Sequence, residues 1–229
     1  MMAAALLSCS IMPDIMAQTN STYDAQFISW PTYNGNDLEL TVNNSGTHFK
    51  LWSPKAKEAR VLLYDNGHTG EAYDILPMKF DAATGTWSTS VDKKLYGKFY
   101  TFQINKDGKW LKETPGVWAK AVGVNGDRAA IIDFSTTNPE GWSSDKRPEV
   151  KSFSDVIVYE MHHRDMSMHP SSGIANKGKF LALTEPGTKS PEGMKTGIDH
   201  LKELGVTHVH ILPSYDYNSV DEMNLQNNT

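Results

Sequence analysis

The stretch FYTFQINKDGKW, Phe99 to Trp110, sets the architecture of the first half of the chain. Apolar residues alternate with polar ones from Phe99 to Ile104, which is the two-residue period of a strand with one buried face. Lys106, Asp107 and Gly108 follow, and Gly108 can take the positive φ that a tight turn requires. The stretch predicts a strand of an antiparallel sheet that turns back at Gly108.

The same alternation recurs on both sides of this stretch. It appears in THFKLW, ARVLLYD, TWSTSV and AAIIDF, which are residues 47–52, 59–65, 86–91 and 129–134. Asn- and Gly-containing turns separate these runs, and short alternating strands about every ten residues are typical of an antiparallel sandwich. We therefore predict an immunoglobulin-like β-sandwich over residues 37–134, with Trp52, Trp87 and Trp118 in its core.

The periodicity changes after residue 134. Residues 135–154 are rich in Pro, Ser and charged side chains, which predicts a linker. DVIVYE (155–160) and THVHILP (207–213) are continuous apolar runs, typical of strands buried on both faces. MKTGIDHLKELG (194–205) has helical spacing, with Thr196 to cap it and Gly205 to end it. Residues 155–229 therefore begin as a parallel strand, helix and strand.

Composition excludes several classes of protein. The 229 residues include 39% hydrophobic side chains, enough for two domains with real cores. The net charge is -5 and the Lys and Arg residues are scattered, so nucleic acid is not an expected partner. The single cysteine, Cys9, excludes an internal disulfide framework and a cysteine-based zinc cluster.

The pattern of the N-terminal residues predicts an export segment. Residues 1–17 combine an apolar run with Pro13 and a small residue, Ala17, before Gln18, as a signal peptide does, although no basic residue precedes the run. Cys9 in LLSC offers an alternative, a lipoprotein acylation site with a lipid anchor, and an apolar helix packed on the domain is another. Residues 18–36 form a polar extension, and no other segment is long and apolar enough for a membrane span. The protein is expected to be periplasmic, on the cell surface or extracellular.

A charged cluster follows the first apolar strand of the second half, in VIVYEMHHRDMSMHP, residues 156–170. Metal binding is not expected there, because neighbouring strand residues point to opposite faces and no HExxH spacing is present. His208 and His210 share a strand face but lie within a predicted buried strand. No cofactor is expected.

Four segments resemble type I pullulanases of the alpha-amylase superfamily, glycoside hydrolase family 13. They are AKAVGVNGDRAAIIDF, VIVYEMHHRD, SGIANKGKFLALTEPGTKSPEG and GIDHLKELGVTHVHILPSYDYNSVDE, residues 119–134, 156–165, 172–193 and 197–222. The resemblance implies that residues 37–134 are a sandwich of the carbohydrate-binding module 48 type. It also implies that residues 155–229 begin a (β/α)8 barrel that hydrolyses α-1,6 linkages of pullulan, starch or glycogen.

The family's retaining chemistry uses an Asp nucleophile after barrel strand four, a Glu acid/base after strand five and a stabilising Asp after strand seven. A double displacement needs two carboxyl groups about 5 Å apart, and a whole barrel takes about 250 residues. Residues 155–229 reach only the second strand, so no catalytic residue is assigned. The expectation is an N-terminal fragment that is inactive by itself and whose partner is the rest of the barrel.

Candidate sugar-binding residues also follow from the resemblance. Tyr159, His162, Arg164 and Asp165 match the family pattern YELHVRD and are expected at the lip of the barrel cleft. The alternative is an Arg–carboxylate network that fixes the strand end. In the sandwich, Trp110 and Asn125 occupy positions that resemble those contacting glucose in glycogen-binding modules, whereas many such modules in pullulanases are spacers.

The main alternative function is a stand-alone α-glucan-binding module with a vestigial barrel segment. A working hydrolase of another kind is not expected, because the sequence contains no nucleophile elbow and no phosphate loop.

Overall fold

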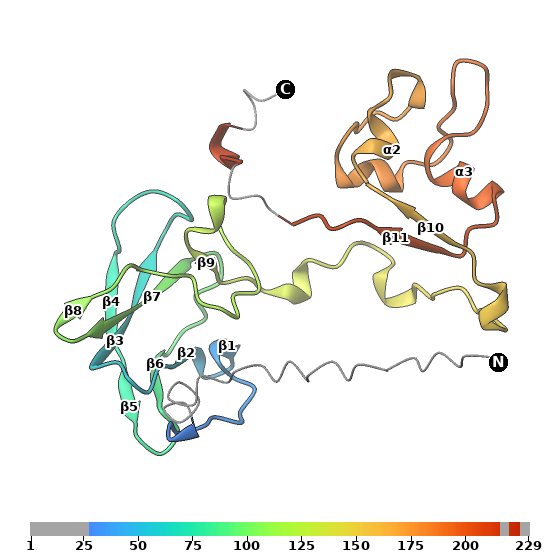
Figure 1. Cartoon of the computed structure of the whole chain (residues 1–229). Coiled ribbons are helices and arrows are strands. Elements are labelled where there is room, and N and C mark those ends of the chain that lie inside the picture. The colour runs from blue at the N-terminus through green and yellow to red at the C-terminus, as the bar shows by residue number, and fades with distance from the viewer. Residues whose placement is uncertain (1–27, 216–219, 225–229) are drawn as a thin grey trace, which may run out of the picture. The chain divides into compact units, whose positions relative to one another are not determined.

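A computed structural model describes residues 28–215 and 220–224 of the chain (Figure 1). These residues divide into two compact units, one of residues 28–136 with 221–224 and the other of residues 137–215 with 220. The predicted export signal, Cys9 and most of the predicted extension lie outside the described residues. Within the described ranges, no helix is long and apolar enough to cross a membrane.

The first unit contains two antiparallel sheets (Figure 1). One sheet has the order β1-β2-β6-β5, formed by β1 (Glu39–Asn43), β2 (Gly46–Trp52), β6 (Thr86–Val91) and β5 (Lys79–Asp81). The other has the order β4-β3-β7-β8, formed by β4 (Asp74–Pro77), β3 (Glu58–Tyr64), β7 (Phe99–Lys106) and β8 (Lys109–Trp110), and β9 (Ala129–Ala130) also pairs with β7. The predicted alternating strands at β2, β3, β6 and β7 are confirmed.

Both sheets contribute to one core, as the alternation requires. Val61 of β3 and Phe102 of β7 face each other across the ladder and are fully buried. Phe49 of β2 packs edge-on against Tyr100 of β7, with ring centroids 5.2 Å apart. Such edge-to-face contacts add to the free energy gained by burying the rings.

Two predictions about this unit were wrong. The strand predicted at residues 129–134 is only the two residues of β9, because Asp133 accepts hydrogen bonds from the Ser135 N–H and hydroxyl and begins the turn η2 (Phe134–Thr136). Trp118 is 65% exposed, since the segment around it is outside the strand ladders, and Trp52 lies at the surface too. Trp87 is buried, as predicted. The strands β1, β4 and β5 were not predicted.

The second unit contains a parallel pair of strands, β10 (Val158–Met161) and β11 (His208–Ile211), in the register Tyr159 to Val209. Between them lie α2 (Asp165–Met168), η5 (Pro170–Ser172), η6 (Phe180–Thr184) and α3 (Gly197–Glu203). The predicted strand–helix–strand unit with parallel pairing is confirmed. The strands were predicted to be buried on both faces, but most of their side chains are exposed, because the described residues include no layer that covers them.

Short 3-10 turns complete the chain: η1 (Val124–Gly126), η3 (Trp142–Ser144), η4 (Phe153–Asp155) and η7 (Glu222–Asn224). Thr196 lies at the N-cap of α3, but its hydroxyl binds the Ser172 carbonyl and the Thr188 hydroxyl rather than the helix backbone. Gly205 has a φ of 76° just after the helix, in agreement with its predicted role at the helix end.

Candidate functional site

Trp110 lies on β8 after the Asp107-Gly108 turn and is half-buried. The Arg60 guanidinium is 4.0 Å from the centroid of its indole, and Arg60 Nε and Nη2 donate to Gln103 Oε1 at 2.8 and 2.6 Å. One face of the indole is thus in a cation–π contact with a fixed guanidinium. A sugar ring that stacks on this face must compete with Arg60.

The sheet surface beside Trp110 is closed by a second set of contacts. The hydroxyls of Tyr64 and Thr101 both donate to Glu113 Oε2, and the Thr101 bond is 2.6 Å long. The Arg128 guanidinium lies 3.5 Å from the Tyr64 ring centroid. Burial raises the pKa of the Tyr64 hydroxyl, and the bond to Glu113 raises it further. These groups hold one another and leave little of this surface open.

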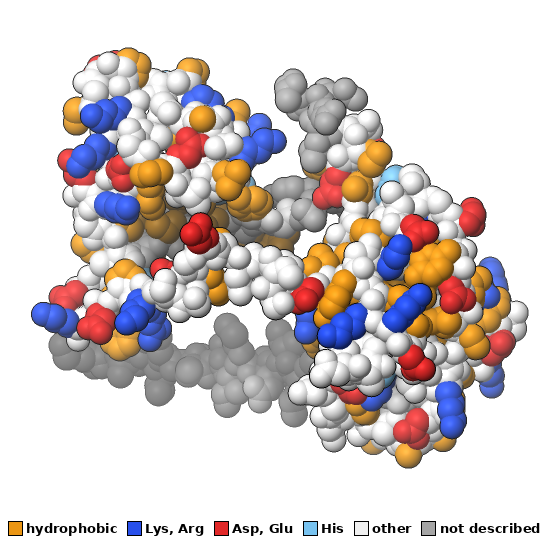
Figure 2. All heavy atoms as spheres, turned by 180° about the vertical axis from the view of Figure 1, so that it is seen from behind, with side chains coloured by type: hydrophobic (Ala, Val, Ile, Leu, Met, Phe, Trp, Pro, Cys, Tyr) orange, Lys and Arg blue, Asp and Glu red, His pale blue; other side chains and the backbone are white. Residues whose placement is uncertain are grey.

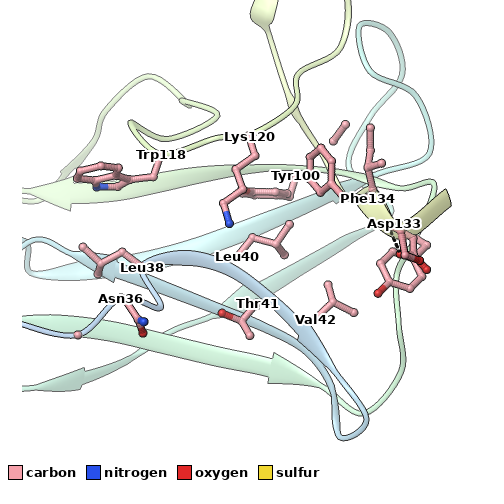
Figure 3. Close-up of a pocket in the computed structure, with 15 residues that line it drawn as sticks. Asn36, Leu38, Leu40, Thr41, Val42, Tyr100, Trp118, Lys120, Asp133 and Phe134 are labelled. Atoms are coloured by element: carbon pink, nitrogen blue, oxygen red, sulfur yellow. Dashed lines mark hydrogen bonds between the residues drawn. The ribbon is translucent and has the colours of Figure 1, made fainter. Parts of the chain in front are cut away.

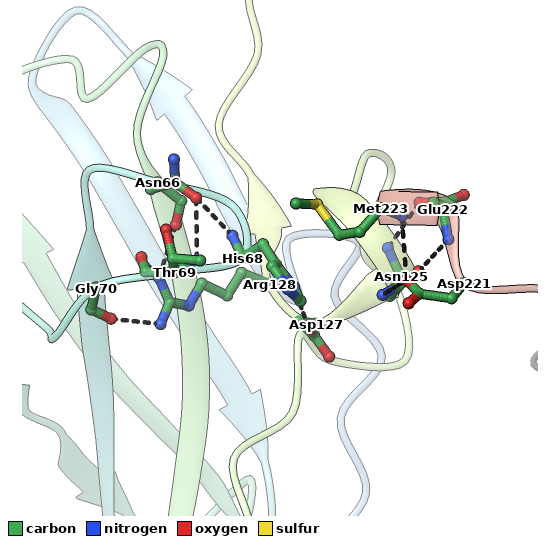
Figure 4. A network of polar contacts seen from close by, with 10 residues as sticks. All are labelled: Asn66, His68, Thr69, Gly70, Asn125, Asp127, Arg128, Asp221, Glu222 and Met223. Carbon is green, nitrogen blue, oxygen red and sulfur yellow. Dashed lines mark hydrogen bonds and ion pairs between the residues drawn. The ribbon is translucent and has the colours of Figure 1, made fainter. Parts of the chain in front are cut away.

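Asn125 lies in η1, and its backbone and side chain bind Asp221 and Glu222 of the same chain (Figure 4). Its N–H donates to Glu222 Oε2 at 2.6 Å, its Nδ2 donates to Asp221 Oδ1 at 3.0 Å, and its Oδ1 accepts from the Glu222 N–H at 2.8 Å. The bond from Asn125 is the largest cause of a lowered pKa at Asp221. A sugar can use the Asn125 amide only if residues 221 and 222 release it, so glucan contact here stays a prediction.

Neighbouring loops fix the position of η1 (Figure 4). His68 Nδ1 lies 2.7 Å from Asp127 Oδ2. Arg128 donates three bonds of 2.7 Å to the carbonyls of Asn66, Thr69 and Gly70. The loop of residues 66–70 is thereby tied to the turn that contains Asn125.

In the second unit, Tyr159 lies on β10 and the other predicted residues follow it, where His162 Nδ1 accepts from the Arg164 N–H at 3.2 Å. His162 Nδ1 is 3.9 Å from Asp165 Oδ1, and the His162 ring stacks on His163, which stacks on Phe180. Tyr159 and Arg164 are exposed. Glu160 pairs with His210 on the adjacent strand at 3.2 Å. This unit presents a polar strand end, and within the described ranges no group of His, Cys, Asp or Glu could hold a metal ion.

The long loop after η5 is organised by Glu185. Its carboxylate accepts from the N–H groups of Ala175 and Asn176 at 2.8 and 2.7 Å and from Asn176 Nδ2 at 2.6 Å. The two backbone donors hold the pKa of Glu185 below its ordinary value. The hydrogen bonds of Glu185 therefore hold this loop in a defined conformation.

A cleft that was not predicted from the sequence opens beside β1 (Figure 3). It has a volume of about 720 Å³ and is lined by β1, by residues 118–120 and by residues 130–135. Trp118 and Phe134 lie along one wall with Lys120 between them, and Leu38, Leu40 and Val42 lie along the opposite wall. The sequence predicted Trp118 in the core of the sandwich, but the structure places it in the wall of this cleft.

Buried Glu39 fixes the wall behind Trp118. Glu39 is 3% exposed. Burial raises the pKa of its carboxyl, and the N–H groups of Trp118 and Val117 oppose this shift by lowering the pKa. A Cβ at Gly116, whose φ is 102°, would lie 2.5 Å from this carboxyl. Glycine is therefore required for the close approach of residues 116–118 to Glu39.

The sandwich matches a known family. Residues 37–115 match the family described as "Carbohydrate-binding module 48 (Isoamylase N-terminal domain)". The match covers most of the first unit described above.

The chain is also similar to pullulanases. It is 36% identical over 193 residues to the pullulanase of Bacillus subtilis strain 168, an alignment that covers 83% of this chain and 25% of that protein. A Paenibacillus barengoltzii pullulanase, solved in complex with maltohexaose and alpha-cyclodextrin, superposes with a TM-score of 0.82 at 48% identity over 89% of this chain and 31% of that one. The pullulanase from Bacillus acidopullulyticus superposes with a TM-score of 0.77 at 39% identity, over 83% of this chain and 23% of that one. This chain spans about a quarter to a third of the length of these relatives.

Proposed function

The chain is of the pullulanase type and carries a carbohydrate-binding module 48 domain, and on this premise we propose that it serves a glycoside hydrolase that cleaves α-1,6 linkages of α-glucans. The observation that carries the proposal is 48% identity, with a TM-score of 0.82, to a pullulanase solved with maltohexaose and alpha-cyclodextrin. In this proposal residues 37–134 bind the glucan, and residues 155–229 contribute the first strands of a (β/α)8 barrel.

Catalysis in this proposal is expected to use residues on barrel strands other than β10 and β11. The resemblance places the family's catalytic carboxylates after barrel strands four, five and seven, and the described residues of the second unit contain two strands, β10 and β11. The exposed apolar side chains of β10 and β11, such as Val158 and Ile211, support a role as part of a larger sheet. Tyr159, His162, Arg164 and Asp165 would lie at the lip of the sugar cleft.

Two assays on the purified 229-residue chain test this proposal. Retention in an amylopectin-containing gel, relative to an inert protein of similar charge, is expected if the sandwich binds α-glucan. Incubation with pullulan is expected to release no maltotriose, and activity should appear when the chain is joined to strands three to eight of a related barrel. Turnover by the purified chain alone would contradict the second part of the proposal.

A second candidate function, a stand-alone α-glucan-binding module, is favoured by one observation. The sandwich has a complete core of fully buried side chains from both sheets, including Phe49, Val61 and Phe102, so its core does not depend on the second unit. The two candidates differ in the coding sequence expected downstream of Thr229. Codons for further βα units would favour the hydrolase, and their absence in every frame would favour the module.

We also propose that the protein is exported, on the basis of the apolar residues 1–17. A fusion of residues 1–36 to alkaline phosphatase, which folds only after export, tests this. An inactive, cytoplasmic fusion would rule it out, and acylation of Cys9 in labelling with palmitate would identify the lipoprotein alternative.

A further inference from the structure

We propose that the cleft between β1 and residues 118–135 binds an α-glucan chain, as a surface distinct from the one around Trp110. This inference rests on the proposed function, since it assumes that the sandwich binds glucan. It adds where the glucan lies and which side chains hold it.

Exposed aromatic rings line the cleft. Trp118, Phe134 and Tyr96 are 65%, 49% and 37% exposed, and all three line a space of about 720 Å³. This volume lies within the range of about 300–1,000 Å³ that is usual for ligand sites. Aromatic faces stack on the apolar faces of pyranose rings, and a row of them suits an extended oligosaccharide.

Polar groups lie between these aromatic rings. Lys120 projects its ammonium into the cleft between Trp118 and Phe134 (Figure 3), and among the described residues it forms no ion pair. Asp133 uses Oδ1 for both of its bonds to Ser135, which leaves Oδ2 as an acceptor for a hydroxyl. Because the cleft contains one cationic side chain, Lys120, and one anionic side chain, Asp133, it attracts neither anionic nor cationic ligands strongly. It therefore suits a neutral ligand with many hydroxyls rather than a phosphate or a polyamine.

The walls of the cleft are ordered without a ligand. Residues 116–118 lie close to the buried Glu39, because a Cβ at Gly116 would be 2.5 Å from its carboxyl and the Trp118 N–H lowers the pKa of that carboxyl. The opposite wall is β1, which is paired along its whole length with β2, for example Leu40 with Phe49. A site whose walls are already ordered loses less conformational entropy on binding.

The surface around Trp110 is less accessible to a sugar than the ring of Trp118. The indole of Trp110 is covered on one face by Arg60, and the amide of Asn125 is bound by residues 221 and 222. By contrast, the ring of Trp118 is largely open to solvent. A glucan can therefore stack on Trp118 without first displacing a guanidinium such as that of Arg60.

Isothermal titration of the whole chain with maltoheptaose tests the inference. Trp118→Ala is expected to weaken binding by about tenfold or more, as truncating a central aromatic anchor does. Trp142→Ala is the matched control, because Trp142 is 59% exposed and does not line the cleft, and its affinity should equal that of the wild type. Both side chains lie at the surface, so circular dichroism should find both variants folded.

Trp110→Ala separates the possible results. If Trp118→Ala keeps wild-type affinity, the cleft inference is overturned, and if Trp110→Ala then abolishes binding, the proposed glucan-binding function stands with Trp110 as its site. If the wild-type chain binds no maltoheptaose at all, glucan binding by the sandwich fails as well.

A second readout checks the location directly. Oxidation of tryptophan by N-bromosuccinimide, measured by mass spectrometry, should slow at Trp118 when maltoheptaose is present and stay unchanged at Trp142. Equal oxidation of Trp118 with and without the sugar, at a concentration that saturates binding, would place the ligand elsewhere.

Discussion

Asn125 and Glu222 bind each other in both directions, although 97 positions separate them in the chain. The Asn125 N–H donates to the Glu222 carboxylate, and the Glu222 N–H donates to the Asn125 side-chain oxygen. Asn125 can do this because it has a φ of 57°, a left-handed conformation that Asn adopts more readily than most residues. The segment η7 is therefore held on the sandwich by one asparagine of η1.

Removing the Asn125 side chain should release η7. Asn125→Gly keeps the left-handed backbone without strain but deletes the amide, so the Glu222 N–H loses its acceptor. This N–H should then exchange with solvent up to about tenfold faster, in line with about 0.5–1.5 kcal/mol for a hydrogen bond between neutral groups. Hydrogen exchange followed by mass spectrometry measures this. Asn125→Ala should have the same effect and also cost about 1 kcal/mol of stability from its positive φ. Unchanged exchange at Glu222 in both variants would contradict the reciprocal pairing.

Glu39 should make the sandwich less stable as the pH rises. Burial raises the pKa of its carboxyl above the ordinary value of 4.5, so between 4.5 and the folded-state pKa the folded chain binds more protons than the unfolded chain. Stability from this group is thus present below pH 4.5 and is lost as the pH rises through the folded-state pKa. Glu39→Gln cannot titrate, so its melting temperature relative to that of the wild type should be higher at pH 7 than at pH 4.5.

The exposed Glu71 provides the control for this experiment. Glu71→Gln should shift the melting temperature by nearly the same amount at both pH values. A Glu39→Gln difference that is also independent of pH, or that favours the variant more at pH 4.5, would show that the wild-type carboxyl does not titrate in this way.

The strands with clear alternation could be predicted because each buries one face. β7 is the best example, since Tyr100 and Phe102 enter the core while Thr101 and Gln103 lie on the other face. Its neighbours β2, β3 and β6 have the same pattern. The parallel pairing of β10 and β11 could also be predicted, because a helix between two apolar runs favours a right-handed crossover.

The candidate site was harder to predict because tertiary contacts determine it. Trp118 is a large aromatic residue of the kind that usually packs in a core. The contact of Glu39 with residues 116–118, which local sequence does not reveal, places it at the edge of a cleft. Asn125 resembles a sugar-binding residue, but Asp221 and Glu222 are too far along the sequence for any local pattern to reveal the pairing. β1 was missed because it begins at Glu39, a charged residue with a φ of 71°.

The contact between Arg60 and Trp110 should contribute measurably to stability. Arg60→Ala removes a cation–π contact at 4.0 Å and the paired bonds to Gln103, and it should cost about 1 kcal/mol in urea denaturation followed by circular dichroism. Lys55→Ala is the comparison, because the Lys55 ammonium lies farther from its ring, 5.5 Å from the Trp30 centroid. A cost for Lys55→Ala equal to or above that for Arg60→Ala would argue against a fixed guanidinium over Trp110.

Glu185 should hold the loop after η5 in place at neutral pH. Its pKa is lowered by the N–H groups of Ala175 and Asn176, so its carboxylate supports the loop above pH 4.5 and loses this effect as the pH falls through the folded-state pKa. Glu185→Gln replaces one acceptor oxygen with an NH2 group that faces these donors. At pH 7 the Ala175 and Asn176 amides should therefore exchange faster in the variant than in the wild type.

The size of this difference should depend on pH, which distinguishes a charge effect from a packing effect. The ratio of variant to wild-type exchange rates should fall toward one as the wild-type carboxylate takes up a proton, since neither side chain is then charged. Glu192→Gln, an exposed change on the same loop that touches neither amide, should leave both rates unchanged at every pH. If the ratio for Glu185→Gln stays constant below pH 4.5, the loop is held by shape alone and the carboxylate charge contributes nothing to its order.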